Sequence, residues 1–360
     1  MRKSEEMLFA LLRASLHEKD TETSFFVDVT ATDWKECYQL AKMQGVMALA
    51  WDGVLRLPIA LHPDMEFKLQ WGIKVEHVER RHQHYCKVAS EITELYKQHD
   101  IATLHLKGVG LSTLYPVPSH REGGDIDIYT YAANKSISDH EANALADALI
   151  KQQGMDVDIE TSPKHSFFYY KGIPVENHKT LLNVHTLRIA KQVEEILKEH
   201  MHPQSVSLGS GEILIPSAEF NALFVAFHAV QHFGSGLSIH HLCDLAVIMN
   251  RYGLHLPKEI TDERLLRAIF ALTTLCNRLL GTSIKVKEEK EFAEKILKEM
   301  LHPKYYKRPL PQSKMGGAIY KVKRFIYNQK LKKEIFDIPV WKNFCIAVLR
   351  KLWHPSKIFN

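Results

Sequence analysis

The feature of the sequence that most limits its fold is a change in the spacing of apolar residues at Ile101. Before this residue, apolar side chains recur every three or four positions, as in amphipathic helices. After it, short runs of alternating or β-branched residues indicate strands. These runs are IATLHL (101–106), DIDIYTY (125–131), MDVDIET (155–161), HSFFYY (165–170) and IPVENH (173–178).

Helix signals separate the earlier runs. VGLSTLYP (109–116) fits a short helix that Pro116 stops, and SISDHEANALADALIKQQG (136–154) fits a capped helix. The last two runs are joined across Lys171-Gly172, which predicts a hairpin. Strands and helices in this order predict an α+β fold with a mixed β-sheet.

Helical sequence flanks this segment on both sides, and a chain of 360 residues can bury two or three cores. After about residue 186 the helical period returns, for example in AEFNALFVAFHAVQHF (218–233). We therefore expect an N-terminal helical region at 1–98, an α/β core at 99–190 and a C-terminal helical region with a basic tail at 191–360.

Composition and cysteine usage indicate an ordinary globular protein of a reducing compartment. Hydrophobic residues make up 45% and charged residues 25% of the chain, and no run approaches the about 20 apolar residues of a membrane span. The N-terminus lacks the pattern of a secretory signal. The five cysteines never occur in CxxC spacing, which argues against a disulfide framework or a zinc ribbon. We therefore expect a cytoplasmic protein without a transmembrane segment.

Two aspartates, Asp125 and Asp127, lie within the second of the apolar runs. In a strand both carboxylates point to one face and the neighbouring isoleucines to the other. A buried carboxylate is costly unless it is paired, hydrogen-bonded or bound to a cation. Chance alone gives about five acid-x-acid pairs in a chain with 42 acids, and DVDIE (156–160) is another example. The context distinguishes the first pair, because it follows Gly123-Gly124, where the backbone can approach a ligand.

Such a pair suits metal-assisted phosphoryl or nucleotidyl transfer. Mg²⁺ prefers carboxylate oxygens and keeps its remaining positions for water and substrate phosphates. A third carboxylate from a neighbouring strand usually completes the set, and Glu176 in IPVENH is the candidate. The upstream Lys107-Gly108 turn lies between a strand and a helix, where phosphate can meet backbone N–H groups.

These motifs together carry a family resemblance. LKGVGLSTLYPVPSHREGGDIDIY (106–129), followed about fifty residues later by VENH (175–178), resembles the nucleotidyltransferase superfamily of polymerase-β-like fold. Within that superfamily it is similar to a bacterial branch of uncharacterised nucleotidyltransferases with a KG, LYP, R, GDID and E-x-H pattern. The motifs cover about residues 100–190, and the HLCDLA helix (241–246) also looks like that branch.

The resemblance implies a nucleotidyltransferase-like core and a two-metal reaction. An NMP group would pass from an NTP such as ATP to an acceptor hydroxyl, with Mg²⁺ or Mn²⁺ as the cofactor. Asp125 and Asp127 would be the catalytic metal-binding pair, and Glu176 the third carboxylate, acting as a metal ligand or general base. The acceptor stays open between a small molecule, a sugar, a protein and RNA.

The resemblance also implies how the nucleotide is bound. Lys107 and Gly108 would occupy the place of the Gly-Ser turn that holds the triphosphate in other members. Arg121 would lie near the phosphates, and Gly123 and Gly124 would give the backbone room. Because Lys-Gly stands in place of Gly-Ser, a catalytically degenerate module of the same fold, which binds a nucleotide or a protein without turnover, is the alternative.

Further polar residues have two interpretations each. His178 shares a face with Glu176 and is a possible substrate contact. Asp244 either points into the active cleft or pairs within the helical region. His228 and His232 lie on one helix face, but the Glu of a zinc-hydrolase HExxH motif is missing between them, so partly buried or cleft-lining histidines are expected there rather than zinc ligands.

The last sixth of the chain is strongly basic. Residues 301–360 contain fourteen Lys or Arg residues and two acids. This excess fits a solvated face, a nucleic-acid contact with interleaved aromatic residues, or an amphipathic segment at 341–359 that rests on an anionic membrane surface.

Overall fold

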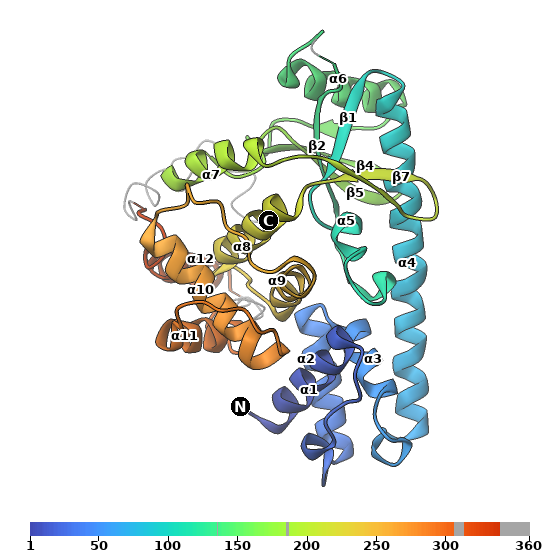
Figure 1. Ribbon diagram of the computed structural model, residues 1–360, viewed down its shortest axis with the longest axis vertical. Helices are drawn as coiled ribbons and strands as arrows, with labels where there is room; N and C mark the ends of the chain where they lie inside the picture. Colours follow the sequence, from blue (N-terminus) through green and yellow to red (C-terminus); the bar gives the residue numbers. More distant parts are fainter. Residues whose placement is uncertain (135, 185–186, 306–312, 339–360) are drawn as a thin grey trace.

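The computed structural model describes residues 1–134, 136–184, 187–305 and 313–338. Figure 1 shows a helical N-terminal part at one end and a β-sheet at the other, with the long helix α4 (Met65–Lys97) running along one side of both. The C-terminal helices lie on the side away from α4. The helix α4 therefore ties the N-terminal part to the sheet.

The N-terminal part is helical, as its apolar spacing predicts. It contains α1 (Lys3–His17), α2 (Ala31–Gln44) and α3 (Met47–Leu55), with 3₁₀ turns at Thr23–Phe26 and Ile59–Leu61. The helix α2 begins at a capping box in which Thr30 and Asp33 each bind the other's backbone N–H group. Trp71 of α4 is buried in this part and contacts the rings of Trp34 and Tyr38 edge-on.

The sheet confirms the predicted α+β class with mixed strand directions. Its strands are β1 (Ile101–His105), β2 (Ile126–Ala132), β3 (Val157–Asp158), β4 (His165–Tyr170), β5 (Ile173–His178), β6 (Gln204–Ser207) and β7 (Glu212–Ile215). They lie in the order β3-β4-β5-β2-β1-β7-β6. The pairs β2–β5 and β1–β7 are parallel, and the others are antiparallel.

The predicted hairpin forms between β4 and β5. Lys171 (φ 48°) and Gly172 (φ 80°) both adopt positive φ, as a two-residue turn between twisted strands requires. The segment 155–161 forms only the two-residue strand β3, because its acids are exposed rather than alternating with buried residues. The strands β6 and β7 lie outside the segment 99–190 in which strands are predicted. The strand β6 (QSVS) contains a single apolar residue, and β7 (EILI) is a short apolar run in a region expected to be helical.

One face of the sheet is packed and the other carries the acids. Ile126 and Ile128 of β2 are buried in one cluster with Val88 of α4 and Ala146 of α6 (Asp139–Gln152). Because side chains alternate along a strand, Asp127 points to the opposite face. Between β1 and β2 the chain forms the short helix α5 (Val109–Ser112) and a 3₁₀ turn, η3 (Pro118–His120).

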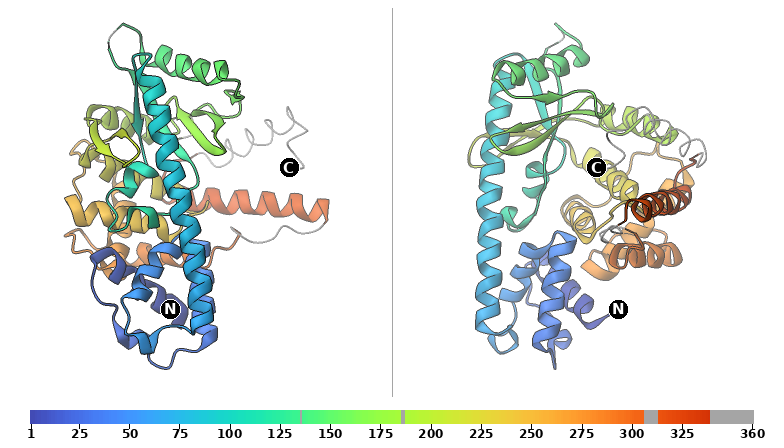
Figure 2. Two further views of the ribbon diagram at one scale, coloured as in Figure 1. Left: turned by 90° about the vertical axis from the view of Figure 1, so that its right-hand side faces the viewer. Right: turned by 180° about the vertical axis from the view of Figure 1, so that it is seen from behind.

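The C-terminal part is a helical assembly beside that second face. Its elements are α7 (Arg188–Glu199), α8 (Ala218–His232), α9 (Ile239–Tyr252), α10 (Glu263–Leu275), a π-helical turn η4 (Cys276–Leu280), α11 (Lys290–Leu301) and α12 (Lys314–Lys333). It joins the N-terminal part through one apolar cluster and through His17 of α1, whose Nε2 lies 2.8 Å from the Leu280 carbonyl oxygen. Figure 2 shows α12 extending away from the rest of the molecule.

Part of the basic tail lies outside the described residues, including the amphipathic segment expected at 341–359 and Cys345. The other four cysteines are buried free thiols. Within the described ranges, none of the helices is long and apolar enough to cross a membrane. Contact of the tail with a membrane or a nucleic acid therefore stays a prediction.

Candidate active site

Two parallel strands bring the predicted carboxylates together. Asp127 of β2 is the register partner of Glu176 of β5, so the two side chains leave the sheet on the same face. Asp125 comes immediately before β2. One carboxylate oxygen from each of the three lies within 4.8 Å of the others. The three acids are thus close enough for a divalent cation to bind between them.

Asp127 is surrounded by basic groups. Its side chain is buried, and its Oδ2 lies 3.0 Å from Nζ of Lys107. Its Oδ1 lies 3.1 Å from Nε2 of His178, which is also 3.5 Å from Oε2 of Glu176. Nδ1 of His165 lies 3.2 Å from the same Glu176 oxygen. Both oxygens of Asp127 therefore have partners within the protein.

The electrostatics of the three acids differ. The charge of Asp127, together with burial, raises the pKa of Asp125 to about 6. Burial acts to raise the pKa of Asp127 as well, but Lys107 and the hydrogen bond with His178 hold it well below its usual range. For Glu176 burial is likewise outweighed, and the hydrogen bond with His178 lowers its pKa. Asp127 and Glu176 are thus ionised near neutral pH, whereas Asp125 loses its proton only as the pH rises through about 6.

A buried polar network behind the acids fixes the position of β5. The carbonyl oxygen of the Asn177 side chain accepts hydrogen bonds from Thr130 Oγ1 (2.9 Å) and Asn143 Nδ2 (3.0 Å). Its amide nitrogen donates to Asp147 Oδ1 (2.9 Å), which also accepts from Ser166 Oγ (2.6 Å). This network connects β2, β4, β5 and α6, so it holds the register that places Glu176 beside Asp127.

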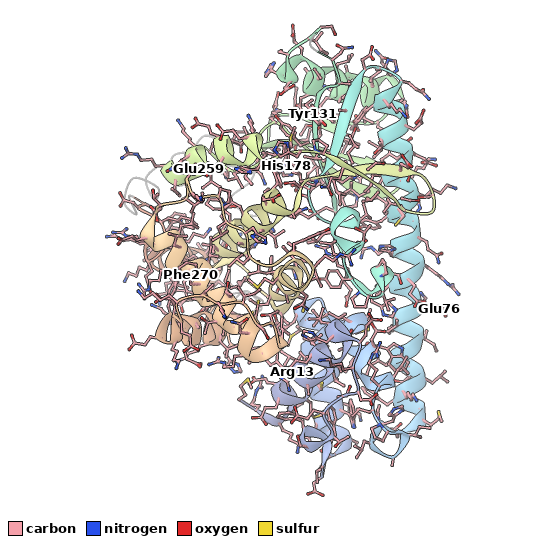
Figure 3. The ribbon with its side chains drawn as sticks, viewed as in Figure 1. Arg13, Glu76, Tyr131, His178, Glu259 and Phe270 are labelled. Atoms are coloured by element: carbon pink, nitrogen blue, oxygen red, sulfur yellow. The ribbon has the colours of Figure 1, made fainter. Side chains whose placement is uncertain are left out.

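A cleft of about 290 Å³ lies in front of the acids. The predicted residues that line it are Lys107, Gly108, Arg121, Gly123, Gly124, Asp125, Asp127 and Asp244. Glu176 and His178 lie beside it, and His178 is fully buried, so it contacts Asp127 rather than the cleft. Figure 3 shows His178 deep in the molecule, near the point where the sheet meets the C-terminal helices.

Glycines shape the wall of the cleft on the side of Asp125. Gly108, which precedes α5, has a φ of +57°, and a Cβ there would lie 3.4 Å from the Asp125 carbonyl oxygen. A Cβ at Gly124 would meet nothing within 4 Å. The backbone at Gly123-Gly124 is therefore open to a ligand, as the sequence predicts.

Arg121 is bound to Asp244 rather than to the acids of the sheet. Its Nε and Nη2 donate to Oδ1 and Oδ2 of Asp244, both at 2.8 Å. The Tyr115 hydroxyl donates to the same Oδ1 at 2.6 Å. Asp244 therefore lines the cleft, and its partners Arg121 and Tyr115 lie in the segment between β1 and β2 rather than within the helical region. This bidentate pair connects the loop before β2 to α9.

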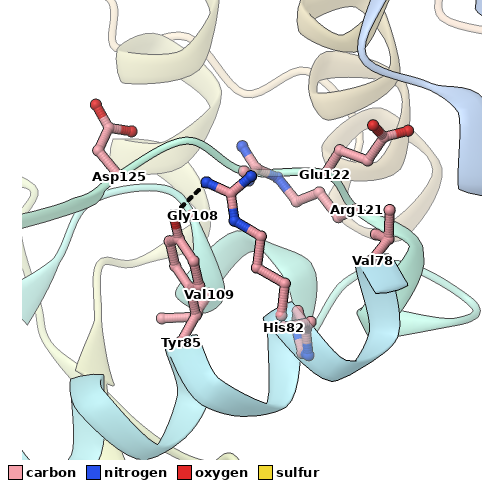
Figure 4. Close-up of a pocket in the computed structure, with 10 residues that line it drawn as sticks. Val78, His82, Tyr85, Gly108, Val109, Arg121, Glu122 and Asp125 are labelled. Atoms are coloured by element: carbon pink, nitrogen blue, oxygen red, sulfur yellow. Dashed lines mark hydrogen bonds between the residues drawn. The ribbon is translucent and has the colours of Figure 1, made fainter. Parts of the chain in front are cut away.

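A smaller pocket of about 80 Å³ adjoins the cleft on the side of α4 (Figure 4). The Tyr85 hydroxyl donates to the Gly124 carbonyl oxygen at 2.9 Å and accepts from Nη2 of Arg81 at 2.7 Å. The pocket shares Gly108 and Asp125 with the main cleft. It lies where a ligand bound at the Gly123-Gly124 turn would extend toward α4.

Sequence reasoning missed these α4 residues and several others in the cleft. Gly45 from the turn after α2, Glu122 and His240 of α9 also line it, and so does His228 of α8, which the sequence predicts to be partly buried or cleft-lining. Glu122 accepts a hydrogen bond from the Ala48 backbone N–H at 3.1 Å, at the start of α3. No local pattern marks these residues, because only the tertiary packing of separate helices brings them to the cleft.

The other acid-x-acid pair has a different environment. Asp156 is exposed, and Oδ1 of Asp158 accepts hydrogen bonds from the backbone N–H groups of Glu160 and Thr161, both at 3.0 Å. These carboxylates lie in a surface turn.

The chain has similarities to known proteins in sequence and in structure. Residues 30–281 match a family described as uncharacterised nucleotidyltransferase, and this span contains every predicted site residue. Among solved structures, the chain is similar to an antigenic nucleotidyltransferase-like protein from Paracoccidioides brasiliensis, with 14% sequence identity and a TM-score of 0.37. That match covers 55% of this chain and 93% of the other. No curated protein matches the sequence.

Proposed function

The chain belongs to this family of uncharacterised nucleotidyltransferases, and from that premise we propose that it transfers an NMP group from an NTP to an acceptor hydroxyl and releases pyrophosphate. The observation that carries the proposal is the register pair Asp127–Glu176, with Asp125 beside it, at the edge of a cleft that holds basic residues. Nucleotidyl transfer needs acids that bind metal ions and basic side chains that bind phosphate, and here the three acids lie beside a cleft lined by Lys107 and Arg121.

The three carboxylates fit a divalent cation, Mg²⁺ or Mn²⁺. Asp125, Asp127 and Glu176 offer hard oxygen donors, and the raised pKa of Asp125 reflects a repulsion that a bound cation would relieve. When bound, the ion would neutralise phosphate charge and acidify the acceptor hydroxyl.

Lys107 is placed to bind the triphosphate. In the ligand-free protein its ammonium neutralises Asp127. Phosphate oxygens in the cleft would offer it a second anionic partner, while Gly123 and Gly124 leave the backbone accessible. The guanidinium group of Arg121 stays hydrogen-bonded to both oxygens of Asp244, and it adds positive charge at the wall of the cleft.

Glu176 is the group placed to take the acceptor proton. Its side chain is 24% exposed and its pKa is lowered, so it is ionised and reachable near neutral pH. His178 positions it, because its Nε2 lies between Glu176 and Asp127. The acceptor itself is a small molecule, sugar, protein or RNA that carries this hydroxyl.

Pyrophosphate release tests the proposal. Wild type should release pyrophosphate from an NTP with Mg²⁺ and a suitable acceptor panel, and Asp127→Asn should lower the rate at least about 100-fold. Asp156→Asn is the matched control, since it removes an exposed acid of the same spacing and should leave the rate unchanged. Equal rates in wild type and Asp127→Asn would refute the assignment.

The alternative, a module that binds a nucleotide without turnover, is favoured by one observation. Both oxygens of Asp127 already have partners, Lys107 and His178, so the acid is neutralised without a metal. Isothermal titration with Mg²⁺ and an NTP distinguishes the two functions. Binding without pyrophosphate release across the acceptor panel would support the non-catalytic module.

A further inference from the structure

Three histidines meet on the C-terminal side of the cleft. His228 and His232 lie one turn apart on α8, with ring centroids 4.5 Å apart. His241, in the first turn of α9, brings its ring within 5.5 Å of His228 and 4.7 Å of His232. One ligand nitrogen from each lies within 4.8 Å of the other two. The sequence places only the first two on one face, and the packing of α8 against α9 adds the third.

We propose that His228, His232 and His241 bind one divalent transition-metal ion, Zn²⁺. A Zn–N bond of about 2.0–2.1 Å places the nitrogens of a tetrahedral site about 3.3 Å apart. The three nitrogens therefore need to move together by at most about 1.5 Å, which rotation of imidazole side chains can supply. An all-imidazole donor set suits Zn²⁺ and not Mg²⁺, so this site is chemically distinct from the three carboxylates.

The protonation of the histidines supports a metal site. Burial, with the charge of Lys107 nearby, holds the pKa of His228 well below its usual value and lowers that of His232 to about 4. Burial and His240 likewise lower the pKa of His241. All three imidazoles are thus neutral at pH 7, which is the form that binds metals.

Ser238 is placed to orient one of the ligands. Its backbone N–H donates to Nδ1 of His241 at 3.2 Å, and its Oγ lies 3.1 Å from the same nitrogen. Metal binding through Nε2 requires the proton on Nδ1, which would then donate to the Ser238 hydroxyl oxygen. Once Nδ1 of His241 carries a proton, it no longer accepts the hydrogen bond from the Ser238 backbone N–H. Metal binding therefore breaks the capping box at the start of α9.

The site would leave one coordination position open. Three histidine ligands with a free fourth position are typical of a reactive rather than a purely structural zinc site. His228 lines the same cleft as Asp125 and Asp127, so an oxygen group in the cleft can reach that position. Lys107 and Lys164 lie near the histidines, and their positive charge favours an anionic oxygen ligand there.

The surroundings argue against a zinc hydrolase. Ala229, Val230 and Gln231 occupy the positions between the first two ligands, so the helix supplies no carboxylate to act as a general base. Binding of a group, rather than hydrolysis, is the role that this set of side chains supports.

Zinc titration of the metal-free full chain tests the proposal without relying on any enzymatic activity. Wild type should bind one equivalent of Zn²⁺, measured by competition with a chromogenic chelator and by elemental analysis. His232→Gln should weaken binding at least about 100-fold, and Ser238→Ala about 10-fold, because a residue that hydrogen-bonds a metal-binding histidine contributes about 10–100-fold to the affinity. His140→Gln, which changes an exposed histidine of α6, should bind Zn²⁺ as wild type does.

Two results would overturn the proposal. One is Zn²⁺ affinity in His232→Gln equal to that of wild type, and the other is loss of that affinity in Asp127→Asn, which would assign the zinc to the carboxylates. If His232→Gln fails to fold, the visible spectrum of the wild type loaded with Co²⁺ decides. Intense bands of a four-coordinate nitrogen site support the histidine site, whereas the weak spectrum of an octahedral oxygen site refutes it. Because the readouts are metal affinity and a spectrum, failure of the proposed nucleotidyl transfer would not affect them.

Discussion

Nζ of Lys107 lies 3.0 Å from Oδ2 of Asp127, so the lysine expected to bind phosphate is paired with an acid expected to bind metal. Burial acts to lower the pKa of Lys107, but Asp127 and Asp125 outweigh it and raise that pKa. The lysine therefore remains charged and occupies the position of a cation in the ligand-free protein. When a metal and a nucleotide bind, Asp127 must exchange Lys107 for the metal ion, and Lys107 must exchange Asp127 for a phosphate group.

Lys107→Gln should affect metal and nucleotide binding in opposite directions. Without the ammonium, Asp127 is free to bind a cation, so Mg²⁺ affinity measured without nucleotide should rise. The affinity for the NTP should fall about 10-fold or more, because a charge-assisted hydrogen bond contributes about 1.5–3 kcal/mol. Isothermal titration measures both constants, and a fall in both would show that Lys107 supports the metal site rather than competing with it.

Asp125→Asn should stabilise the metal-free protein at high pH. A folded-state pKa near 6, above the ordinary value of 3.8, means that wild type loses stability as the pH rises from about 4 through 6. The Asn variant lacks this loss, so its free energy of unfolding at pH 8 should exceed that of wild type by about 1–3 kcal/mol. The difference should vanish near pH 4.

Urea denaturation at pH 4 and pH 8, without divalent metal, measures this effect. Asp156→Asn is the control and should match wild type at both values, since Asp156 is exposed. Added Mg²⁺ should stabilise wild type but not Asp125→Asn, because ligand binding to the folded state raises its stability. A variant no more stable than wild type at pH 8 would contradict the repulsion between Asp125 and Asp127.

Asp244→Ala should destabilise the protein by about 3–5 kcal/mol, because it leaves the Arg121 guanidinium buried without a partner. The two side chains are each only 8% exposed. The double variant Arg121→Met/Asp244→Leu should regain most of that loss, since it removes both charges. Chemical denaturation of the single and double variants measures the coupling, and additive effects would mean that the pair contributes packing alone.

The sequence predicts on which face of each strand the acids lie because strand alternation is a local rule, whereas the pairing of β2 with β5 joins distant parts of the chain. Period-two spacing in DIDIYTY and IPVENH places Asp127 and Glu176 on one face, and the β2–β5 register then makes them neighbours. The Gly123-Gly124 turn is similarly marked by its residues, because glycine has no side chain to cover the backbone.

The rest of the site comes from packing between distant segments. Tyr85 of α4 reaches the smaller pocket and His228 of α8 reaches the cleft from helices whose apolar spacing does not indicate their neighbours. Glu122 reaches the cleft from the loop before β2. Asp244 has two interpretations from sequence, and only the packing of α9 against the loop before β2 shows that it lines the cleft and pairs with Arg121. The strands β6 and β7 join the sheet by backbone pairing. The side chains of β6 do not indicate a strand, and the apolar run of β7 does not indicate which strand it pairs with.

His120 connects the N-terminal helices to the loop that carries Arg121. Its Nδ1 lies 2.8 Å from Asp52 of α3 and its Nε2 2.9 Å from Glu79 of α4. Burial acts to lower its pKa, but the hydrogen bonds and charges of Asp52 and Glu79 raise it overall. Stability from this triad is therefore complete below the unfolded pKa of about 6.5 and is lost as the pH rises through the folded value.

His120→Gln should thus cost more stability at pH 6 than at pH 9, by about 1–2 kcal/mol, because the lost hydrogen bonds involve charged groups. Denaturation of wild type and variant across this range measures the difference. His140→Gln, whose histidine is exposed on α6, should show no pH-dependent change. If His120→Gln lowers the free energy of unfolding by the same amount at every pH, the imidazole stabilises the protein by packing rather than by its charge. Since Arg121 follows His120 directly, the variant should also disturb the alignment of the Arg121 guanidinium with Asp244. We therefore expect its NTP affinity to be lower than that of wild type at the pH values where His120 is charged.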